Sequence, residues 1–231
     1  MLDDAVHVWV MPLAAGPERM AALYAALAPD ERQRADRFLA AHAREQFVIA
    51  RATLRQILGR YVGAAPADLR FVTDGNGKPA LSGRELFFNV SHSGGLAVYA
   101  MTRRGEVGID VEQLRPRATL LDMADRFFAP AEAWAIRSLP PDRREEAFFH
   151  VWTRKEAFIK AIAQGLSFGL ERFEVSVPPD EPPRIRHIDG DPGSGAAWSL
   201  VALAPAPGYV GALAIRGPMP AVQVRTWRAD G

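Results

Sequence analysis

Apolar and polar residues alternate along several short stretches of the chain and recur at helical spacing along several longer ones. Strict alternation, as in residues 107–112, predicts a strand with one buried face. Spacings of three and four, as for Leu54, Ile57 and Leu58 within residues 44–62, predict an amphipathic helix. The pattern predicts helices at residues 17–27, 29–41, 44–62, 120–127, 130–139 and 143–163, and strands at residues 5–10, 85–90, 96–101, 107–112, 172–177, 184–188, 198–203, 209–215 and 222–227.

Helices and hairpin-like strands occur in both halves of this order, without a long run of βαβ units. The fold class is therefore expected to be α+β. The chain has 231 residues, which is enough for one large or two small domains. We expect two lobes of similar size that meet near residue 105, an N-terminal lobe of residues 1–104 and a C-terminal lobe of residues 105–231.

Composition narrows the functional classes. The chain contains no cysteine, which excludes disulfides, thiolate metal sites and a cysteine nucleophile. A net charge of +1 argues against nucleic acid as the main partner. Asp3 and Asp4 stand where a signal peptide would carry basic residues. The uncharged residues 196–215 contain Pro205 and Gly208 and indicate two strands rather than a membrane helix. We expect a cytoplasmic protein without a membrane partner.

Charge is distributed unevenly between the two expected lobes. Residues 1–104 carry 13 basic and 10 acidic side chains, whereas residues 105–231 carry 15 basic and 17 acidic ones. Seven arginines fall within residues 32–60, against only Asp36 and Glu45. A basic helical pair facing an acidic pocket would suit a polyanionic ligand bridged by a metal ion. A solvated helix face with ordinary salt bridges explains each single arginine equally well.

Two carboxylates follow each other at strand spacing in Gly108-Ile109-Asp110-Val111-Glu112. Residues two apart on a strand share a face, so Asp110 and Glu112 project together. Such hard oxygen ligands suit Mg²⁺ or Mn²⁺. For this motif taken alone, two solvated acids on an exposed strand remain the simpler interpretation.

A third carboxylate lies in the helix predicted at residues 143–163. Trp152, Glu156 and Lys160 are spaced four apart and form one row. Glu156, partly desolvated beside the aromatic ring, could complete a metal site or act as a general base. Lys160 could pair with it or hold a phosphate. An ordinary surface pair of Glu156 and Lys160 is the alternative.

A turn with phosphate-binding character follows the strand at residues 85–90. Ser91-His92-Ser93-Gly94-Gly95 offers hydroxyls and amides that could hold a phosphate. A Ser–His hydrolase dyad is disfavoured, because adjacent turn residues rarely reach that geometry and no G-x-S-x-G motif is present. Lys78, between Gly77 and Pro79, means little by itself.

These motifs become specific when they are taken in order. An arginine-rich helix with Arg51-Ala52-Thr53-Leu54-Arg55 precedes Gly-Lys-Pro, Phe-Asn-x-Ser-His-Ser, Gly-x-Asp-x-Glu and finally Trp-Thr-x-Lys-Glu-Ala-x-x-Lys. The set, from about residue 29 to residue 169, closely resembles the Sfp-type 4′-phosphopantetheinyl transferases. The chain's only lysines, Lys78, Lys155 and Lys160, all fall inside these motifs.

The resemblance implies an activity and an architecture. Family members move the phosphopantetheine arm of coenzyme A to a serine of an apo carrier protein and release adenosine 3′,5′-bisphosphate. They are typically monomers of two pseudo-symmetric lobes, each with helices on a small, mainly antiparallel sheet. Coenzyme A binds between the lobes with Mg²⁺, for which Mn²⁺ is a possible substitute.

The resemblance also implies roles for particular residues. Asp110, Glu112 and Glu156 would bind the metal ion, and Glu156 and Lys160 would be catalytic. The residues implied to contact coenzyme A are Arg51, Lys78, Ser91, His92, Lys155 and Lys160, with Arg34 and Arg55 as weaker candidates. His92 and Arg51 would face the 3′-phosphate end.

The implied acceptor is an acyl, peptidyl or aryl carrier protein, which requires a docking surface. Carrier proteins of this type are commonly acidic, which the basic N-terminal lobe would attract. Phe127, Phe128 and Trp134 are candidates for apolar docking contacts, although core packing is the preferred interpretation for each. Two rival functions remain open, a non-catalytic module that binds coenzyme A or a carrier, and a metal-dependent phosphoesterase.

Overall fold

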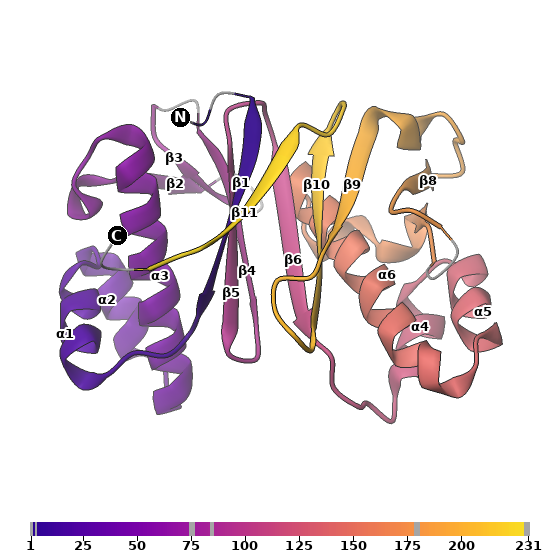
Figure 1. Cartoon of the computed structure of the whole chain (residues 1–231), viewed down its shortest axis with the longest axis horizontal. Coiled ribbons are helices and arrows are strands. Elements are labelled where there is room, and N and C mark those ends of the chain that lie inside the picture. Colours follow the sequence, from indigo (N-terminus) through magenta and orange to yellow (C-terminus); the bar gives the residue numbers. More distant parts are fainter. Residues whose placement is uncertain (1, 3, 74–76, 84–85, 178–180, 229–231) are drawn as a thin grey trace.

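A computed structural model describes residues 2, 4–73, 77–83, 86–177 and 181–228 (Figure 1). The α-helices are α1 (Pro17–Ala25), α2 (Pro29–Asp36), α3 (Ala41–Val62), α4 (Leu120–Phe127), α5 (Pro130–Ser138) and α6 (Pro141–Ile162). Short 3₁₀ helices are η1 (Pro66–Asp68), η2 (Leu166–Phe168), η3 (Leu170–Arg172) and η4 (Ser194–Ala197). The strands are β1 (Ala5–Pro12), β2 (Phe71–Thr73), β3 (Pro79–Leu81), β4 (Phe87–Ser93), β5 (Leu96–Thr102), β6 (Val107–Gln113), β7 (Phe173–Val175), β8 (Ile185–Ile188), β9 (Trp198–Leu203), β10 (Tyr209–Arg216) and β11 (Ala221–Thr226).

The expected α+β class is confirmed, because helices pack on small, mainly antiparallel sheets. One sheet has the order β11-β1-β5-β4 and the other the order β6-β10-β9. The short hairpins β2-β3 and β7-β8 flank them, and β2 and β3 were not predicted. Residue 85, the start of one predicted strand, lies outside the described residues. Residues 196–215 supply β9 and β10, as their Pro and Gly residues predicted.

The elements form four layers, with the two sheets lying between two groups of helices (Figure 1). Helices α1–α3 cover the outer face of the first sheet, and α4–α6 cover the outer face of the second. A third apolar cluster lies between the sheets and includes Val8, Val98, Ile109 and Leu213. The alternation of residues 107–112 explains the placement of β6, because Ile109 and Val111 enter this central cluster while Asp110 and Glu112 face away from it.

The end of the chain returns to the first lobe. β11 pairs in parallel with β1, with Ala5 opposite Ala221 and Val10 opposite Thr226. Trp227 follows it into the core beneath α1–α3 and is 4% exposed. We expected residues 105–231 to form the C-terminal lobe, whereas β11 belongs to the sheet of the first lobe. The physical reason is that β1 offers β11 a free edge and the N-terminal core offers Trp227 an apolar site.

Gly108 allows α6 to lie unusually close to β6. A Cβ atom added to Gly108 would fall 1.9 Å from the carbonyl oxygen of Ala157 and 2.5 Å from the amide nitrogen of Ala161. Both contacts are backbone atoms of α6, so no side chain could rotate away. The absence of a side chain at residue 108 therefore sets how near α6 can bring Glu156 and Lys160 to Asp110.

Candidate functional site

Asp110 and Lys160 form the centre of the site, where β6 meets α6. The Nζ atom of Lys160 lies 2.6 Å from Oδ1 of Asp110 and donates a longer hydrogen bond, of 3.3 Å, to the carbonyl oxygen of Ile109. Asp110 is buried, whereas the side chain of Lys160 keeps 27% of its surface exposed. A cation that is paired on one side and open on the other is suited to bind an anion at this position.

Ser91 brings the first lobe into the site. Its hydroxyl donates a 2.7 Å hydrogen bond to Oδ1 of Asp110 and accepts one of 3.1 Å from Lys160. The resemblance implied that Ser91 contacts coenzyme A. The structure shows Ser91 buried and hydrogen-bonded to the Asp110 carboxylate and the Lys160 ammonium, an arrangement that can orient Asp110.

Glu156 and Glu112 are two further acidic residues whose electrostatics are linked to Asp110. Burial raises the pKa of Glu156, the negative charges of Asp110 and Glu112 raise it further, and Lys160 opposes them. Burial also raises the pKa of Glu112, whereas a hydrogen bond from Ser93 lowers it. Negative charges that raise one another's pKa favour the approach of a cation, which offsets their repulsion.

The donor set of this group suits a hard divalent cation. Oδ2 of Asp110 is buried and has no hydrogen-bond partner among the described residues. An orphaned carboxylate oxygen of this kind is a ready ligand for a metal ion. In the part of the chain that the structure describes, however, no three His, Cys, Asp or Glu side chains are grouped so that they could hold a metal ion.

Two neighbouring cavities lie near this group, and Glu156 lines one of them. One of about 280 Å³ is lined by Lys78, Asn89, Glu156 and Lys160, among others. Pro79 lines both cavities and therefore places them side by side. Lys78 reaches the second lobe, where its Nζ atom lies 2.6 Å from Glu106 and donates to the carbonyl oxygen of Val107.

The other cavity has a volume of about 470 Å³ and combines apolar walls with cations. Phe38, Phe47, Leu54 and Val90 supply apolar surface, and Arg34, Arg51 and His92 supply polar groups. The structure thus brings Arg34, Arg51 and His92 together. Desolvation lowers the pKa of His92, and the positive charge of Lys160 lowers it further.

Arg55 and Lys155 do not reach either cavity, which corrects the expectation that they contact coenzyme A. Arg55 is 2% exposed and lies 2.6 Å from Glu31. Lys155 is fully buried, lies 2.7 Å from Glu132, and donates to the carbonyl oxygens of Leu170 and Phe173. A buried charge is tolerated only with a close partner. Each of these cations is therefore paired with a buried glutamate of its own lobe.

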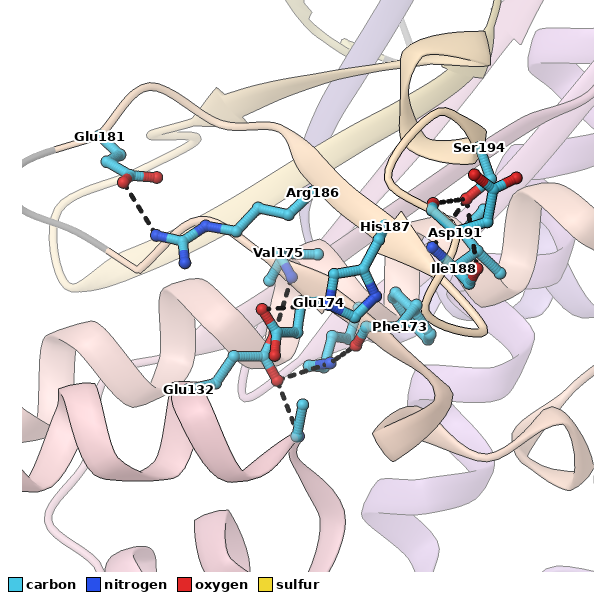
Figure 2. A network of polar contacts seen from close by, with 12 residues as sticks. Glu132, Phe173, Glu174, Val175, Glu181, Arg186, His187, Ile188, Asp191 and Ser194 are labelled. Carbon is cyan, nitrogen blue, oxygen red and sulfur yellow. Dashed lines mark hydrogen bonds and ion pairs between the residues drawn. The ribbon is translucent and has the colours of Figure 1, made fainter.

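Glu31 and Glu132, the buried glutamates of the two lobes, have the same kinds of hydrogen-bond and ion-pair partners. Glu31 accepts a hydrogen bond from the amide of Ala28 and pairs with Arg51 and Arg55 of α3. Glu132 accepts one from the amide of Ala129 and pairs with Lys155 of α6. Figure 2 shows Glu132 beside Val175, whose amide it also binds at 2.7 Å.

Sequence reasoning missed Glu31 and Glu132, although a signal for them exists. Ala28-Pro29-Asp30-Glu31 and Ala129-Pro130-Ala131-Glu132 repeat the pattern Ala-Pro-x-Glu, each at the start of a helix. In both lobes a long helix then supplies the cationic partner. This repeat is shared by the starts of α2 and α5 and is too short to stand out before the structure is known.

Comparison with known proteins identifies the family. A model of the 4′-phosphopantetheinyl transferase superfamily matches residues 106–214, and a model described as 4′-phosphopantetheinyl transferase, N-terminal, matches residues 14–104. The 4′-phosphopantetheinyl transferase HetI of Nostoc sp. is 39% identical over 221 residues, covering 94% of this chain and 90% of the relative. The chain belongs to this family.

Other family members show the same relation over shorter spans. A 4′-phosphopantetheinyl transferase of Bacillus subtilis is 33% identical over 180 residues, which is 78% of each chain. The 4′-phosphopantetheinyl transferase psf-1 of Bacillus pumilus is 35% identical over 161 residues, covering 69% of this chain and 68% of the relative. Within the described residues, no helix has the length and apolar character needed to cross a membrane.

Proposed function

We propose that this family member transfers the 4′-phosphopantetheine arm of coenzyme A to a serine of an apo carrier protein. The observation that carries the proposal is the pairing of Lys160 with Asp110 at a cavity that Lys160 shares with Glu156 and Lys78. In this proposal the cavity with Arg34, Arg51 and His92 holds the nucleotide end of coenzyme A. The cavity with Lys78, Glu156 and Lys160 holds the pyrophosphate.

The chemistry asks for positioning and charge more than for covalent help. The serine oxygen of the carrier attacks the β-phosphorus of the pyrophosphate, and the bond from that phosphorus to the bridging oxygen breaks. Adenosine 3′,5′-bisphosphate leaves with the electron pair. Lys160, held by Asp110 and Ser91, supplies positive charge where negative charge develops. Arg51 and His92 act on a part of the substrate that does not react and thereby orient it.

The serine proton goes to the carboxylate of Glu156 in this proposal. The raised pKa of Glu156 makes its ionised form a stronger base than an exposed glutamate. A divalent cation, Mg²⁺ or Mn²⁺, would be held by Asp110, Glu112 and Glu156, and the unpartnered Oδ2 of Asp110 supports the place of Asp110 in this set. When bound, the cation would supply charge neutralisation on the pyrophosphate oxygens.

The carrier would reach the site from the cleft between the lobes. Phe128 is buried in the second lobe and packs against Phe148 and Trp152, so it offers no docking surface. Phe127 also packs against that core. Trp134 is 71% exposed and remains a candidate contact for a carrier protein. We further propose that the enzyme acts as a cytoplasmic monomer.

Intact mass spectrometry tests the proposed reaction. The protein is incubated with coenzyme A, Mg²⁺ and an apo acyl, peptidyl or aryl carrier protein. A gain of one phosphopantetheine on the carrier is expected, and it should disappear with EDTA and in Glu156→Ala. Glu146→Ala is the matched control, because Glu146 lies on the exposed face of the same helix and should leave transfer unchanged.

Two outcomes of the same experiment would contradict the proposal. Hydrolysis of coenzyme A at the same rate with and without an acceptor would indicate a phosphoesterase. Binding of coenzyme A without transfer to any of several carrier classes would indicate a binding module.

A further inference from the structure

A ladder of side chains joins the two lobes along one side of the site. β4 and β6 are edge strands of different sheets, and polar side chains of β4 take the place of a backbone partner for β6. Three residues at alternating positions of β4 each accept a hydrogen bond from the backbone amide 20 residues further along the chain. The pairs are Asn89 with Ile109 at 2.8 Å, Ser91 with Val111 at 3.3 Å and Ser93 with Gln113 at 3.2 Å.

The hydroxyl groups of the two serines in this ladder donate hydrogen bonds to the acidic residues of β6. Ser91 donates to Asp110 at 2.7 Å, and Ser93 donates to Oε2 of Glu112 at 2.5 Å. An amide can only donate and an ionised carboxylate can only accept, so each hydroxyl has one possible orientation. Ser93 is 8% exposed, and little water can replace its hydrogen bond to Glu112.

The charges around Glu112 explain why such a hydrogen bond is needed. The negative charge of Asp110 repels the ionised carboxylate of Glu112, whereas the positive charges of Arg117 and Arg115 attract it. The hydrogen bond from Ser93 fixes the direction of the Glu112 carboxylate among these opposing charges. Among the hydrogen bonds of the described residues, Ser91 has one with Lys160 and Ser93 has none. The effect of Ser93 on Glu112 can therefore be tested without disturbing Lys160.

We propose that Ser93 is a positioning residue, which holds Glu112 beside Asp110 so that both carboxylates can take the same divalent cation. This inference rests on the proposed function, since it assigns Glu112 to the metal site. It adds that the N-terminal lobe orients the carboxylates of the C-terminal lobe through Ser93. Ser93 acts through Glu112 and does not contact the reacting atoms.

The test measures Mn²⁺ affinity without turnover. Free Mn²⁺ is quantified by electron paramagnetic resonance with the full chain and coenzyme A, in the absence of carrier protein. We expect Ser93→Ala to weaken Mn²⁺ binding about 10- to 100-fold, as is typical for residues that orient metal ligands. Ser93→Thr keeps the hydroxyl and should restore affinity to within a few-fold of the wild type. Ser138→Ala, which removes an exposed hydroxyl from α5, is the control and should change nothing.

A purely structural role for Ser93 predicts a different pattern. Urea unfolding of each variant reports stability separately, and a stability loss with Mn²⁺ affinity within twofold of the wild type would overturn the proposal. If Ser93→Ala does not fold, Ser93→Cys preserves the volume with a weak donor and should still weaken Mn²⁺ binding. If the wild type itself fails to bind Mn²⁺, or fails to transfer phosphopantetheine to a carrier protein, the result instead contradicts the proposed function.

Discussion

Replacing Gly108 with alanine should separate α6 from β6 and thereby disable the site. The added Cβ atom would lie 1.9 Å from the carbonyl oxygen of Ala157, whereas ordinary contacts begin near 3.4 Å. The difference of 1.5 Å must be absorbed by movement of α6, since the opposing atoms are backbone. Overpacking of a core by this much costs about 1–3 kcal/mol of unfolding free energy.

The effect on transfer should exceed the effect on folding. Glu156 and Lys160 are the immediate neighbours of Ala157 and Ala161, the two residues that the new methyl group would strike. A displacement of about 1 Å in positioned groups can reduce a rate about 100-fold. We therefore expect Gly108→Ala to remain folded under assay conditions while its transfer rate falls about 100-fold.

Urea unfolding and the intact-mass transfer assay measure the two effects on the same preparations. Gly16→Ala is the matched control, because Gly16 has φ −70° and a Cβ atom there would meet nothing within 4 Å. It should change stability by less than about 0.5 kcal/mol and leave transfer unchanged. Wild-type stability together with a wild-type transfer rate in Gly108→Ala would refute the reasoning.

Three further predictions concern stability and pH. Lys155→Ala should lower the unfolding free energy by about 3–5 kcal/mol, measured by urea unfolding, because it leaves Glu132 buried and unpaired. The double variant Lys155→Met/Glu132→Gln should recover most of this loss. A raised KM for coenzyme A in the folded double variant would indicate that Lys155 contacts coenzyme A after all. Trp227→Ala should lower the unfolding free energy by about 3–5 kcal/mol in the same assay, since its ring packs edge-on against Trp9 in the first lobe. A loss below about 0.5 kcal/mol would contradict the view that the segment after β11 stabilises the first lobe. In the presence of EDTA, Glu156→Gln should raise the melting temperature at pH 8. Burial raises the pKa of Glu156 above 4.5, so at pH 8 the folded protein holds an ionised carboxylate that the unfolded chain solvates better. That gain should shrink as the pH falls through the raised pKa toward 4.5, and a gain independent of pH would contradict the desolvation argument.

Much of the secondary structure was readable from the sequence because it depends on local periodicity. The helix predicted at residues 120–127 coincides with α4, and the predicted strand at residues 107–112 is one residue shorter than β6. β2 and β3 were missed because three-residue strands show too little alternation to predict. The predicted start of the helix at residues 143–163 was two residues late, since α6 begins at Pro141 and Asp142 lies inside its first turn.

The sequence alone predicted the acidic residues of the candidate site, through their spacing and through the family resemblance that their order carries. Period-two spacing placed Asp110 and Glu112 on one face of a strand, and helical spacing placed Glu156 and Lys160 on one face of a helix. These relations are local and hold in any fold that keeps those elements. The sequence could not distinguish a cation that faces a ligand from one that closes a lobe, because that depends on burial, as Lys155 and Arg55 show.

Only the tertiary structure decided how the two lobes are joined and how the elements within each lobe approach one another. The ladder from β4 to β6, the close approach of α6 at Gly108 and the return of β11 to β1 all connect residues that are distant in sequence. Such contacts depend on how whole elements and sheets are placed relative to one another, which no local pattern encodes. The sequence by itself therefore determined which groups could do the chemistry, and the packing of the lobes determined which of them face one another.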